Sequence, residues 1–514
     1  MAKQSRNIHP FCTFVLLFFC AGLFASGMAR HALAGDDDGS VTLVFVSHLA
    51  DIQRGGDKGG LPELAGLLGQ LRGEGKNVVL IHGGNSLGPS IMSSLDKGAH
   101  MIGLLNQLEP DAMGLGKRDF MHQEAELALR ANEAAFPLTT TNIIETRSGK
   151  APPGLSKTSV INTAGRRIGV CSLVSPAFLT TYVEDGITRQ GGFNLIGKLS
   201  RSLLREKGVE YVIALADYSP KDPRQALEDS DADILYVSAA PQTRFKRVFD
   251  KLWILHESEH DAVIVELLPK PKPVAVGTSP FVIGETRVVK LLEYPRDERL
   301  SQDIERYVSY LDRLMSVEVG VTRTALDTRV PALRDGENAF ANLVADSLRD
   351  YYGADAALVH AGAIKGDHVY KAGSVITRGD LQSELPFRDK SCLVEISGRQ
   401  LWTALEHGLA GLDNENPRLL HVSGLEYVYV KERPVGSRLT LVKVGGQGLV
   451  ATKRYTVALP SHLSKGVEGF SMFGPCMRDA PRPSLDLVEI VRAYIDKHRP
   501  VAPALEGRIL RRSE

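Results

Sequence analysis

The stretch VTLVFVSHLAD (41–51), followed by LPELAGLLGQLRGEG (61–75) and NVVLIHGG (77–84), decides the fold class of this chain. The first and third segments each contain a short apolar run, and the middle segment repeats its apolar residues at the spacing of a helix. Short apolar strands that alternate with amphipathic helices are typical of an α/β layer structure with a mostly buried sheet. We therefore predict an α/β fold.

The same alternation continues beyond these segments. Five more strands are predicted at RRIGVCSLVS (166–175), EYVIALAD (210–217), ADILYVSA (232–239), KLWILHES (251–258) and DAVIVELL (261–268). Several of them end in polar or turn residues. Because ligands bind at such strand ends in open α/β sheets, we expect a functional site there.

A long amphipathic helix is predicted to connect two domains. The segment ERLSQDIERYVSYLDRLM (298–315) carries its apolar residues on one helical face, namely Leu300, Ile304, Tyr307, Val308, Leu311, Leu314 and Met315. We place a layered α/β sandwich at 41–295, the connecting helix at 296–316 and a second α/β domain at 320–514.

Residues 1–34 have the layout of a cleaved export signal. Lys3 and Arg6 precede the apolar run FCTFVLLFFCAGLFA (11–25), and small residues follow it. This run is shorter than the roughly 20 residues of a membrane span. We expect a periplasmic or secreted protein with no integral membrane segment after cleavage, and an uncleaved anchor is the alternative.

Charge and cysteine content exclude further classes. The 61 basic and 61 acidic side chains create no overall field that would attract nucleic acid, so no nucleic-acid partner is expected. After the signal, the chain keeps Cys171, Cys392 and Cys476, which are too few for a disulfide framework or a metal knuckle. We expect buried thiols with at most one bridge.

Motifs in both halves of the chain resemble those of the secreted 5'-nucleotidase family. They are DAMGLG (111–116), FPLTTTNI (136–143), RIGVCSLVSP (167–176), ENAFANLVADSLRDYYGADAALVHAGAIK (337–365), GSVITRGDLQSELPF (373–387), LLHVSGLEY (419–427) and YTVALPSHLSKGVEGFSMF (455–473). The resemblance implies an N-terminal metallophosphatase-like domain, a connecting helix and a C-terminal nucleotide-binding domain. It also implies nucleotide hydrolysis by two divalent cations that activate water and clamp the phosphate.

The positions that match metal ligands of this family are altered here. The first strand of the family ends in Asp-x-His, where this chain has His48 and Ala50. The bridging aspartate after the second strand is replaced by Asn85, a neutral amide. A later Ser-His strand end is replaced by Ala216 and Asp217.

The residues that follow DAMGLG (111–116) differ most in charge from the matching family motif. Where the family has Gly-Asn-His-Glu-Phe, this chain has Lys117, Arg118 and Asp119. A protonated lysine or arginine cannot ligate a cation. A unit positive charge about 4 Å from a divalent ion costs roughly 8 kcal/mol at an effective dielectric near 20. The last family motif has Ala239 and Pro241 at its histidine positions, and neither has a donor atom.

These changes predict that two-metal hydrolysis has been lost and that no metal cofactor is bound. We expect a binding or scaffold protein for a nucleotide-like or phosphorylated ligand or for a protein partner. The alternative is an active nucleotide phosphohydrolase with a single manganese or zinc site rebuilt from His48, Asp51, His82, Asp119 and Asp217.

Two interpretations of Lys117 and Arg118 stay open. Fixed cations where metal ions bind in the family can attract a phosphate, and the arginine fork suits phosphate oxygens. Alternatively, both side chains reach solvent or pair with Asp119 and Asp217.

The nucleotide contacts of the family's C-terminal domain are partly retained. Arg334 matches a family arginine, and His360 and Lys365 replace an asparagine and a second arginine. Glu468 replaces the ribose-binding aspartate. The resemblance therefore implies a ligand site that includes these four residues.

The base sandwich of the family is weaker in this chain. Its two aromatic positions hold Leu419 and His462, and leucine does not stack as an aromatic ring does. Phe470 and Phe473 follow nearby and are predicted to be core residues. We expect His462 to join the ligand site without tight adenosine recognition.

Overall fold

The computed structural model describes residues 39–52, 59–122, 124–176, 186–206, 208–239, 243–256, 258–270, 279–386, 389–413 and 417–513. The signal predicted at 1–34 and Pro241 lie outside these ranges. The chain forms two compact units whose division falls between Glu305 and Arg306, inside helix α8 (Glu298–Met315). No helix in the described ranges is both long enough and apolar enough to cross a membrane.

The first unit contains a six-stranded sheet in the order β14-β13-β1-β2-β3-β4. Its strands are β1 (Val41–Val46), β2 (Val78–His82), β3 (Ala112–Gly114), β4 (Leu138–Thr139), β13 (Asp261–Pro269) and β14 (Phe281–Lys290). β1 to β4 are parallel neighbours, whereas β13 and β14 are antiparallel to their neighbours. The predicted strand–helix–strand start is confirmed, with α1 (Leu61–Gly73) between β1 and β2.

A second six-stranded sheet has the order β11-β12-β10-β9-β7-β6. Its strands are β6 (Thr158–Thr163), β7 (Arg166–Leu173), β9 (Tyr211–Ala216), β10 (Ile234–Val237), β11 (Arg244–Val248) and β12 (Lys251–Leu255). The four inner strands are parallel, and each edge strand is antiparallel to its neighbour. All five further predicted strands are confirmed, whereas β6, β11 and β14 were not predicted.

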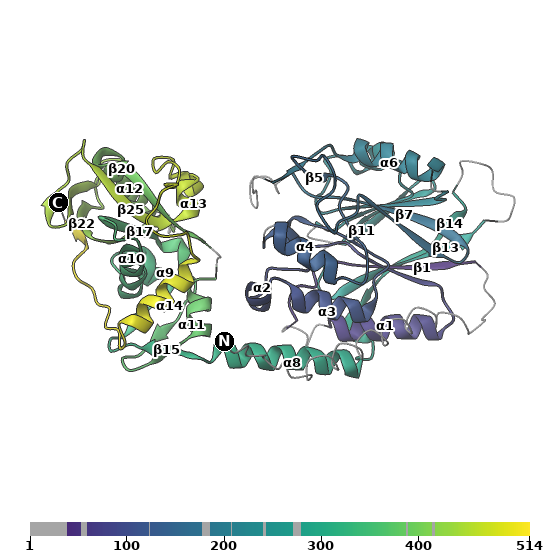
Figure 1. Cartoon of the computed structure of the whole chain (residues 1–514), viewed down its shortest axis with the longest axis horizontal. Coiled ribbons are helices and arrows are strands. Elements are labelled where there is room, and N and C mark those ends of the chain that lie inside the picture. Colours follow the sequence, from purple (N-terminus) through teal and green to yellow (C-terminus); the bar gives the residue numbers. More distant parts are fainter. Residues whose placement is uncertain are drawn as a thin grey trace, which may run out of the picture. The chain divides into compact units, whose positions relative to one another are not determined.

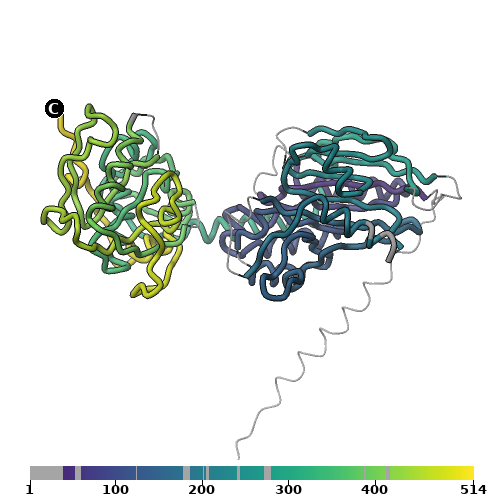
Figure 2. Tube along the Cα trace, turned by 90° about the horizontal axis from the view of Figure 1, so that it is seen from above, coloured from purple at the N-terminus to yellow at the C-terminus, as the bar shows by residue number. Residues whose placement is uncertain are grey.

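The two sheets pack face to face through alternate side chains of their strands. Leu43 and Phe45 of the first sheet share one buried cluster with Ile213 and Tyr236 of the second. Helices cover the outer faces, with α1 and α3 (Ala99–Leu108) beside the first sheet and α6 (Phe193–Glu206) beside the second (Figure 1). The strand β1, purple in Figure 2, runs inside this sandwich.

Smaller elements complete the first unit. They are α2 (Ile91–Asp96), η1 (Lys117–Phe120), α4 (Glu124–Glu133), β5 (Ile143–Glu145), β8 (Ile187–Arg189), α7 (Pro223–Ser230) and η2 (Leu291–Glu293). Because β1, β2, β3, β9, β10 and β12 are parallel within their sheets, the loops after them are available for a site at their carboxyl ends.

The second unit is built on two four-stranded sheets and two short strand pairs. The strands are β15 (Glu318–Val321), β16 (Leu326–Asp327), β17 (Ala356–His360), β18 (Val369–Tyr370), β19 (Val375–Thr377), β20 (Ser391–Ser397), β21 (Leu420–Ser423), β22 (Leu425–Val430), β23 (Leu439–Val444), β24 (Gln447–Gly448), β25 (Arg454–Pro460) and β26 (Ile509–Arg512). The helices are α9 (Val330–Arg334), α10 (Ala339–Tyr352), η3 (Ala361–Ala363), α11 (Arg378–Glu384), α12 (Gly398–Leu409), η4 (Ala410–Asp413), α13 (Ser461–Ser464), η5 (Val467–Gly469) and α14 (Leu487–Lys497).

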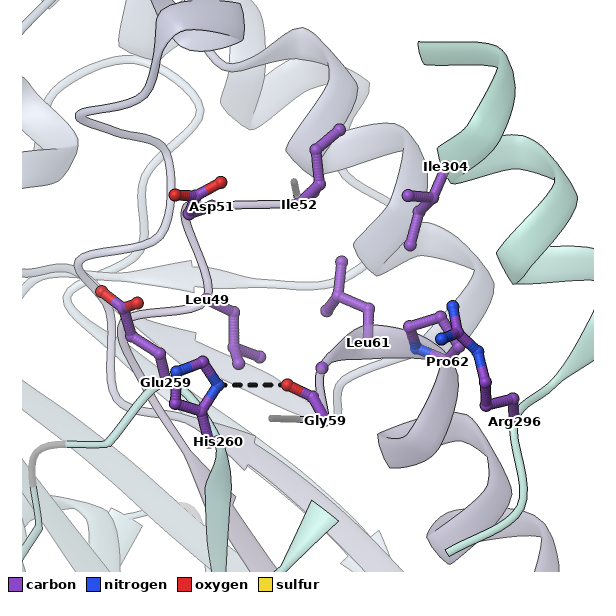
Figure 3. A pocket seen from close by; sticks show the side chains of 11 residues that line it. Leu49, Asp51, Ile52, Gly59, Leu61, Pro62, Glu259, His260, Arg296 and Ile304 are labelled. Atoms are coloured by element: carbon purple, nitrogen blue, oxygen red, sulfur yellow. Dashed lines mark hydrogen bonds between the residues drawn. The ribbon is translucent and has the colours of Figure 1, made fainter. Parts of the chain in front are cut away.

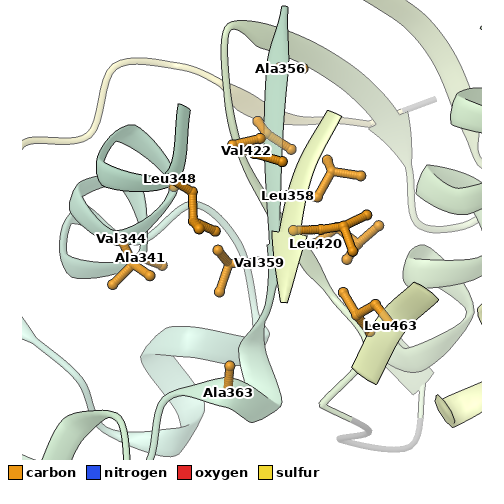
Figure 4. Close-up of a cluster of buried hydrophobic side chains, with 14 of the residues drawn as sticks. Ala341, Val344, Leu348, Ala356, Leu358, Val359, Ala363, Leu420, Val422 and Leu463 are labelled. Carbon is orange, nitrogen blue, oxygen red and sulfur yellow. The ribbon is translucent and has the colours of Figure 1, made fainter. Parts of the chain in front are cut away.

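Helix α10 shows how the sequence builds this unit. Asn338 caps its first turn by accepting the N–H groups of Phe340 and Ala341, and Gly353 ends it at a φ of 64° that glycine adopts without steric cost. Its apolar face packs on β17, where Val359 faces the helix and Leu358 lies on the opposite side of the strand (Figure 4). The buried side chains on both faces of β17 belong to the hydrophobic core of the second unit.

The cysteine prediction is confirmed. Cys392 at the start of β20 is bonded to Cys476, and Cys171 in β7 is a buried thiol. Phe470 and Phe473 are also core residues as predicted, at 0% and 2% exposure. The bridge ties the segment after α13 to the central sheet of the second unit.

Candidate functional site

Asp119 organises the strand ends of the first unit. Its carboxylate accepts the backbone N–H groups of Asn85, Ser86, Leu87 and Gly116 at 2.7 to 2.9 Å. Burial raises the pKa of this carboxyl, and the four donors oppose the rise. Both oxygens are therefore engaged by the loop after β2 and by the turn before η1.

Asn85 also serves the backbone. It occupies left-handed backbone conformation with a φ of 62°, and its Oδ1 accepts the N–H of Arg118 at 3.0 Å. Gly116 lies so close to the Asn85 side chain that a Cβ at this glycine would clash with it. The predicted replacement of the bridging carboxylate is thus an amide that holds η1 against the loop after β2.

Lys117 and Arg118 are placed where β3 ends, and both are half-buried. The backbone N–H of Lys117 donates to Asp217 Oδ2 at 2.5 Å. Within the described ranges, neither cationic side chain forms a hydrogen bond or an ion pair. Pairing with Asp119 or Asp217, which the sequence left open, is not observed.

Asp217 follows β9 and is 5% exposed. Burial raises the pKa of its carboxyl to about 7, against the N–H donors of Lys117 and Ser175. Its Oδ1 is buried without a hydrogen-bond partner in the described part of the chain. This carboxyl therefore titrates near neutral pH.

A buried polar chain joins the two sheets beside these residues. His48 Nδ1 lies 3.1 Å from Ser47 Oγ, Tyr236 donates to Ser47 Oγ at 3.1 Å, and the same tyrosine hydroxyl lies 2.8 Å from His256 Nδ1. Ser238 adds a bond from its hydroxyl to the Gly83 carbonyl at 3.1 Å. Side chains thus connect the ends of β1 and β2 to the ends of β10 and β12.

The three histidines here are neutral at physiological pH. Burial lowers the pKa of His48 to about 4, with Arg118, His256 and Lys117 adding to the effect. Burial also lowers the pKa of His82 to about 3 and that of His256 to about 4. Because Gly84 donates its N–H to His82 Nδ1, the ring proton of neutral His82 sits on Nε2.

The sequence did not single out four members of this polar network, namely Ser47, Tyr236, Ser238 and His256. His256 follows an apolar strand directly, as the candidate polar residues do, so its position at a strand end was the available signal. Tyr236 carried no such signal, because it lies inside an apolar run and only the cross-sheet packing shows its hydroxyl contacts.

The residues present do not fit a two-metal cluster. Asp119 and Asn85 direct their oxygens to backbone N–H groups, and the turn beside them carries two cations, Lys117 and Arg118. In the described ranges, no three His, Cys, Asp or Glu side chains are grouped so that they could hold a metal ion. A single rebuilt site that uses Asp119 is likewise disfavoured, because that carboxylate is already saturated with donors.

A pocket lies beside the end of β1 (Figure 3). Its lining residues do not include Lys117 or Arg118. Leu49, Ile52 and Leu61 form its apolar wall, while Asp51 and His260 supply polar groups. His260 Nδ1 lies 3.1 Å from the Gly59 carbonyl oxygen. Asp51, a candidate for the rebuilt metal site, therefore faces this pocket.

In the second unit, two predicted ligand residues meet. The rings of His360, at the end of β17, and His462, in α13, contact edge to face with centroids 4.7 Å apart. Asp389 lies 3.1 Å from His462 Nδ1. Burial and the neighbouring His462 lower the pKa of His360 to about 3.

The other predicted ligand residues occupy separate segments. Arg334 ends α9, and Lys365 lies exposed after η3, where its backbone N–H donates to the Glu384 carbonyl at 2.8 Å. Glu468 adopts a φ of 55°, and its carbonyl oxygen lies 2.9 Å from His407 Nε2. The charge of Lys365 also contributes to the lowered pKa of His360.

Leu419 and His462 hold the two base-stacking positions that the resemblance implies. Leu419 is 1% exposed and belongs to the core, so it offers no surface to a ligand. Phe470 and Phe473 stack on each other with centroids 5.7 Å apart, inside the same core. An aromatic sandwich from these positions is therefore absent in the described segment.

The two units define an α/β protein with a phosphoesterase-like N-terminal sandwich. Residues 318–475 match the family model described as 5'-nucleotidase, C-terminal domain. The chain is 26% identical over 501 residues to Protein 5NUC of Lutzomyia longipalpis, covering 88% of this chain and 86% of that protein. It is 24% identical over 545 residues to the snake venom 5'-nucleotidase of Crotalus adamanteus, covering 96% and 91%.

A solved structure shows the same fold. The putative 5'-nucleotidase of Staphylococcus aureus, in complex with alpha-ketoglutarate, superimposes with a TM-score of 0.64 at 14% identity, covering 92% of this chain and 99% of that one. The fold is thus the two-domain α/β fold of 5'-nucleotidase structures. Together these similarities support the resemblance to the 5'-nucleotidase family.

Proposed function

We propose that this chain is an exported protein that keeps the 5'-nucleotidase scaffold and binds a nucleotide-like or phosphorylated ligand without two-metal hydrolysis. The observation that supports the proposal is the segment Lys117–Asp119, where the resemblance implies metal ligands but the chain has two cations and a carboxylate that accepts backbone N–H groups. If hydrolysis has been lost, the chain can alternatively act as a scaffold that binds a protein partner.

Loss of hydrolysis is supported by the chemistry of the remaining groups. A two-metal mechanism needs a bridging anion and several fixed ligands. Asn85 supplies a neutral amide that already accepts a backbone N–H. Retained binding is supported by the second unit, where the His360 and His462 rings meet and Asp389 Oδ2 lies 3.1 Å from His462 Nδ1.

The test combines metal content with turnover. The secreted chain is expressed with manganese and zinc in the medium, desalted, and measured for metal per chain and for hydrolysis of AMP and p-nitrophenyl phosphate. We expect less than one metal per chain and no metal-dependent turnover. About two metals per chain together with hydrolysis would overturn the proposal.

A variant provides a sharper control. The triple change Asn85→Asp, Lys117→Asn and Arg118→His should remain inactive, because Ala50 and Ala239 still lack donor atoms. Appreciable turnover in this variant would show that the ligand positions are misassigned.

The second candidate is an active phosphohydrolase with a rebuilt mononuclear site. It is favoured by buried atoms that have no hydrogen-bond partner in the described ranges, namely His82 Nε2, His256 Nε2 and Asp217 Oδ1. One metal per chain, lost together with turnover in Asp217→Asn, would establish this candidate instead.

A further inference from the structure

We propose that the strand ends of the first unit bind a tetrahedral oxyanion, either inorganic phosphate or the phosphoryl group of a larger ligand, through the side chains of Lys117 and Arg118. The inference rests on the proposed function and adds a location and a ligand class. It assigns to side-chain cations the contact that metal ions make in hydrolases of this fold.

The two cations are anchored through their backbone. Lys117 donates its N–H to Asp217, and Arg118 donates its N–H to Asn85. The backbone of this turn is therefore fixed at both residues, and only the side chains remain to be ordered by a ligand. This anchoring reduces the conformational entropy that binding would cost.

Neither neighbouring carboxylate forms an ion pair with these cations among the described residues, although the charge of Lys117 acts to lower the pKa of Asp217. Both oxygens of Asp119 accept backbone N–H groups, and Asp217 accepts the N–H of Lys117 on Oδ2. No ion pair joins either acid to a cationic side chain in the described residues. Lys117 and Arg118 are therefore two consecutive, half-buried residues that both carry a positive charge. Two positive charges in one short turn favour a bound anion.

The adjacent groups are suited to an anion as well. His48 and His82 are buried and neutral, and both cations act on the charge state of His48, which places them near that ring. His82 carries its ring proton on Nε2, a fully buried donor with no partner among the described residues. This donor follows from the Gly84 N–H bond to Nδ1 and is available to an oxygen ligand that reaches the end of β2.

The chemistry selects an oxyanion. Arginine presents parallel N–H groups that match two oxygens of a phosphate or sulfate, and lysine adds a compact charge. A cation would be repelled by the same pair. Lys117 and Arg118 are both protonated, so neither side chain can activate water. We therefore expect the oxyanion to be bound but not cleaved.

The experiment measures binding of inorganic phosphate to the full chain by calorimetry at low ionic strength in the presence of a chelator. The double variant Lys117→Ala and Arg118→Ala should weaken binding about tenfold or more, because hydrogen bonds to charged groups contribute roughly 1.5 to 3 kcal/mol. Arg118→Lys should retain part of the affinity, since the charge remains.

Lys365→Ala tests the alternative site in the second unit, where the lysine is exposed. Phosphate affinity that falls with Lys365→Ala and not with the double variant would overturn the inference. Absence of phosphate binding in the unaltered chain would also overturn it. Circular dichroism of the double variant, expected to match the unaltered chain, separates lost binding from lost folding.

Two further arms separate the sources and the hypotheses. Competition between inorganic phosphate and AMP shows whether the bound group is free phosphate or the end of a nucleotide. Metal-dependent hydrolysis of p-nitrophenyl phosphate would contradict the proposed function whatever the phosphate data show. No hydrolysis with phosphate affinity unchanged in the double variant would contradict only this inference.

Discussion

The two candidate sites differ in what their polar side chains contact. In the first unit, Asp119 and Asn85 bind the backbone of their own loops. In the second unit, His360 and His462 contact each other, and Asp389 pairs with His462. The comparison teaches that polar side chains at one site can hold the backbone of their own loops, while those at a second site are directed at one another.

The largest expected effect tests the backbone role of Asp119. Asp119→Ala would leave four buried N–H groups without an acceptor. We expect the first unit to lose about 3 to 5 kcal/mol of unfolding free energy. Urea denaturation monitored by circular dichroism measures it.

Asp119→Asn keeps one acceptor oxygen and should lose less. A loss below about 1 kcal/mol in Asp119→Ala would show that these N–H groups find other partners, and the contrast between the two sites would disappear.

The next effect concerns how the second unit holds its site. Cys392 and Cys476 are separated by 84 residues, and their bond restrains the segment that carries His462 and Glu468. Cys476→Ser should lower the stability of this unit by about 2 to 4 kcal/mol, as loop closure predicts. Thermal denaturation of oxidised protein gives the comparison.

Cys171→Ala in the first unit is the control, because that thiol takes no part in the bridge. An unchanged transition of the second unit in Cys476→Ser would mean that packing alone maintains its site.

The smallest effect is a pH dependence at Asp217. Its pKa is raised from 3.8 to about 7 in the folded chain, so the folded state binds the proton more tightly than the unfolded state. Stability from this group is fully present below about pH 4 and is lost as pH rises through about 7. The unfolding free energy should fall between pH 5 and 8 by roughly 2 to 3 kcal/mol from this group.

Asp217→Asn removes the titration and should be more stable relative to the unaltered chain at pH 8 than at pH 5. Denaturation curves of both proteins at the two pH values provide the difference. The same difference at both values would show that Asp217 does not titrate in this range.

Inner strands were predictable from the sequence and edge strands were not. β9, β10 and β12 are short apolar runs because both of their faces are covered. β11 reads RFKRV with mostly exposed residues, and charged edge strands of this kind discourage pairing with another chain. β6 and β14 also lie at sheet edges, so their mixed burial gave no apolar run to detect.

The candidate sites were predictable in part. Motif positions located His48, Lys117, Arg118 and Asp217 at strand ends, as the structure has them. The sequence did not show that Asp119 accepts four N–H groups, because its donors come from a loop more than 30 residues earlier and from Gly116. Contacts of this kind depend on the folded backbone.

The link from Tyr236 to Ser47 has a consequence for how the sandwich closes. Together with the Ser238 bond to Gly83, it fastens two separately wound sheets with groups that the chain itself supplies. Mutual fixing of the two sheets at this edge therefore comes from hydroxyl groups buried between them.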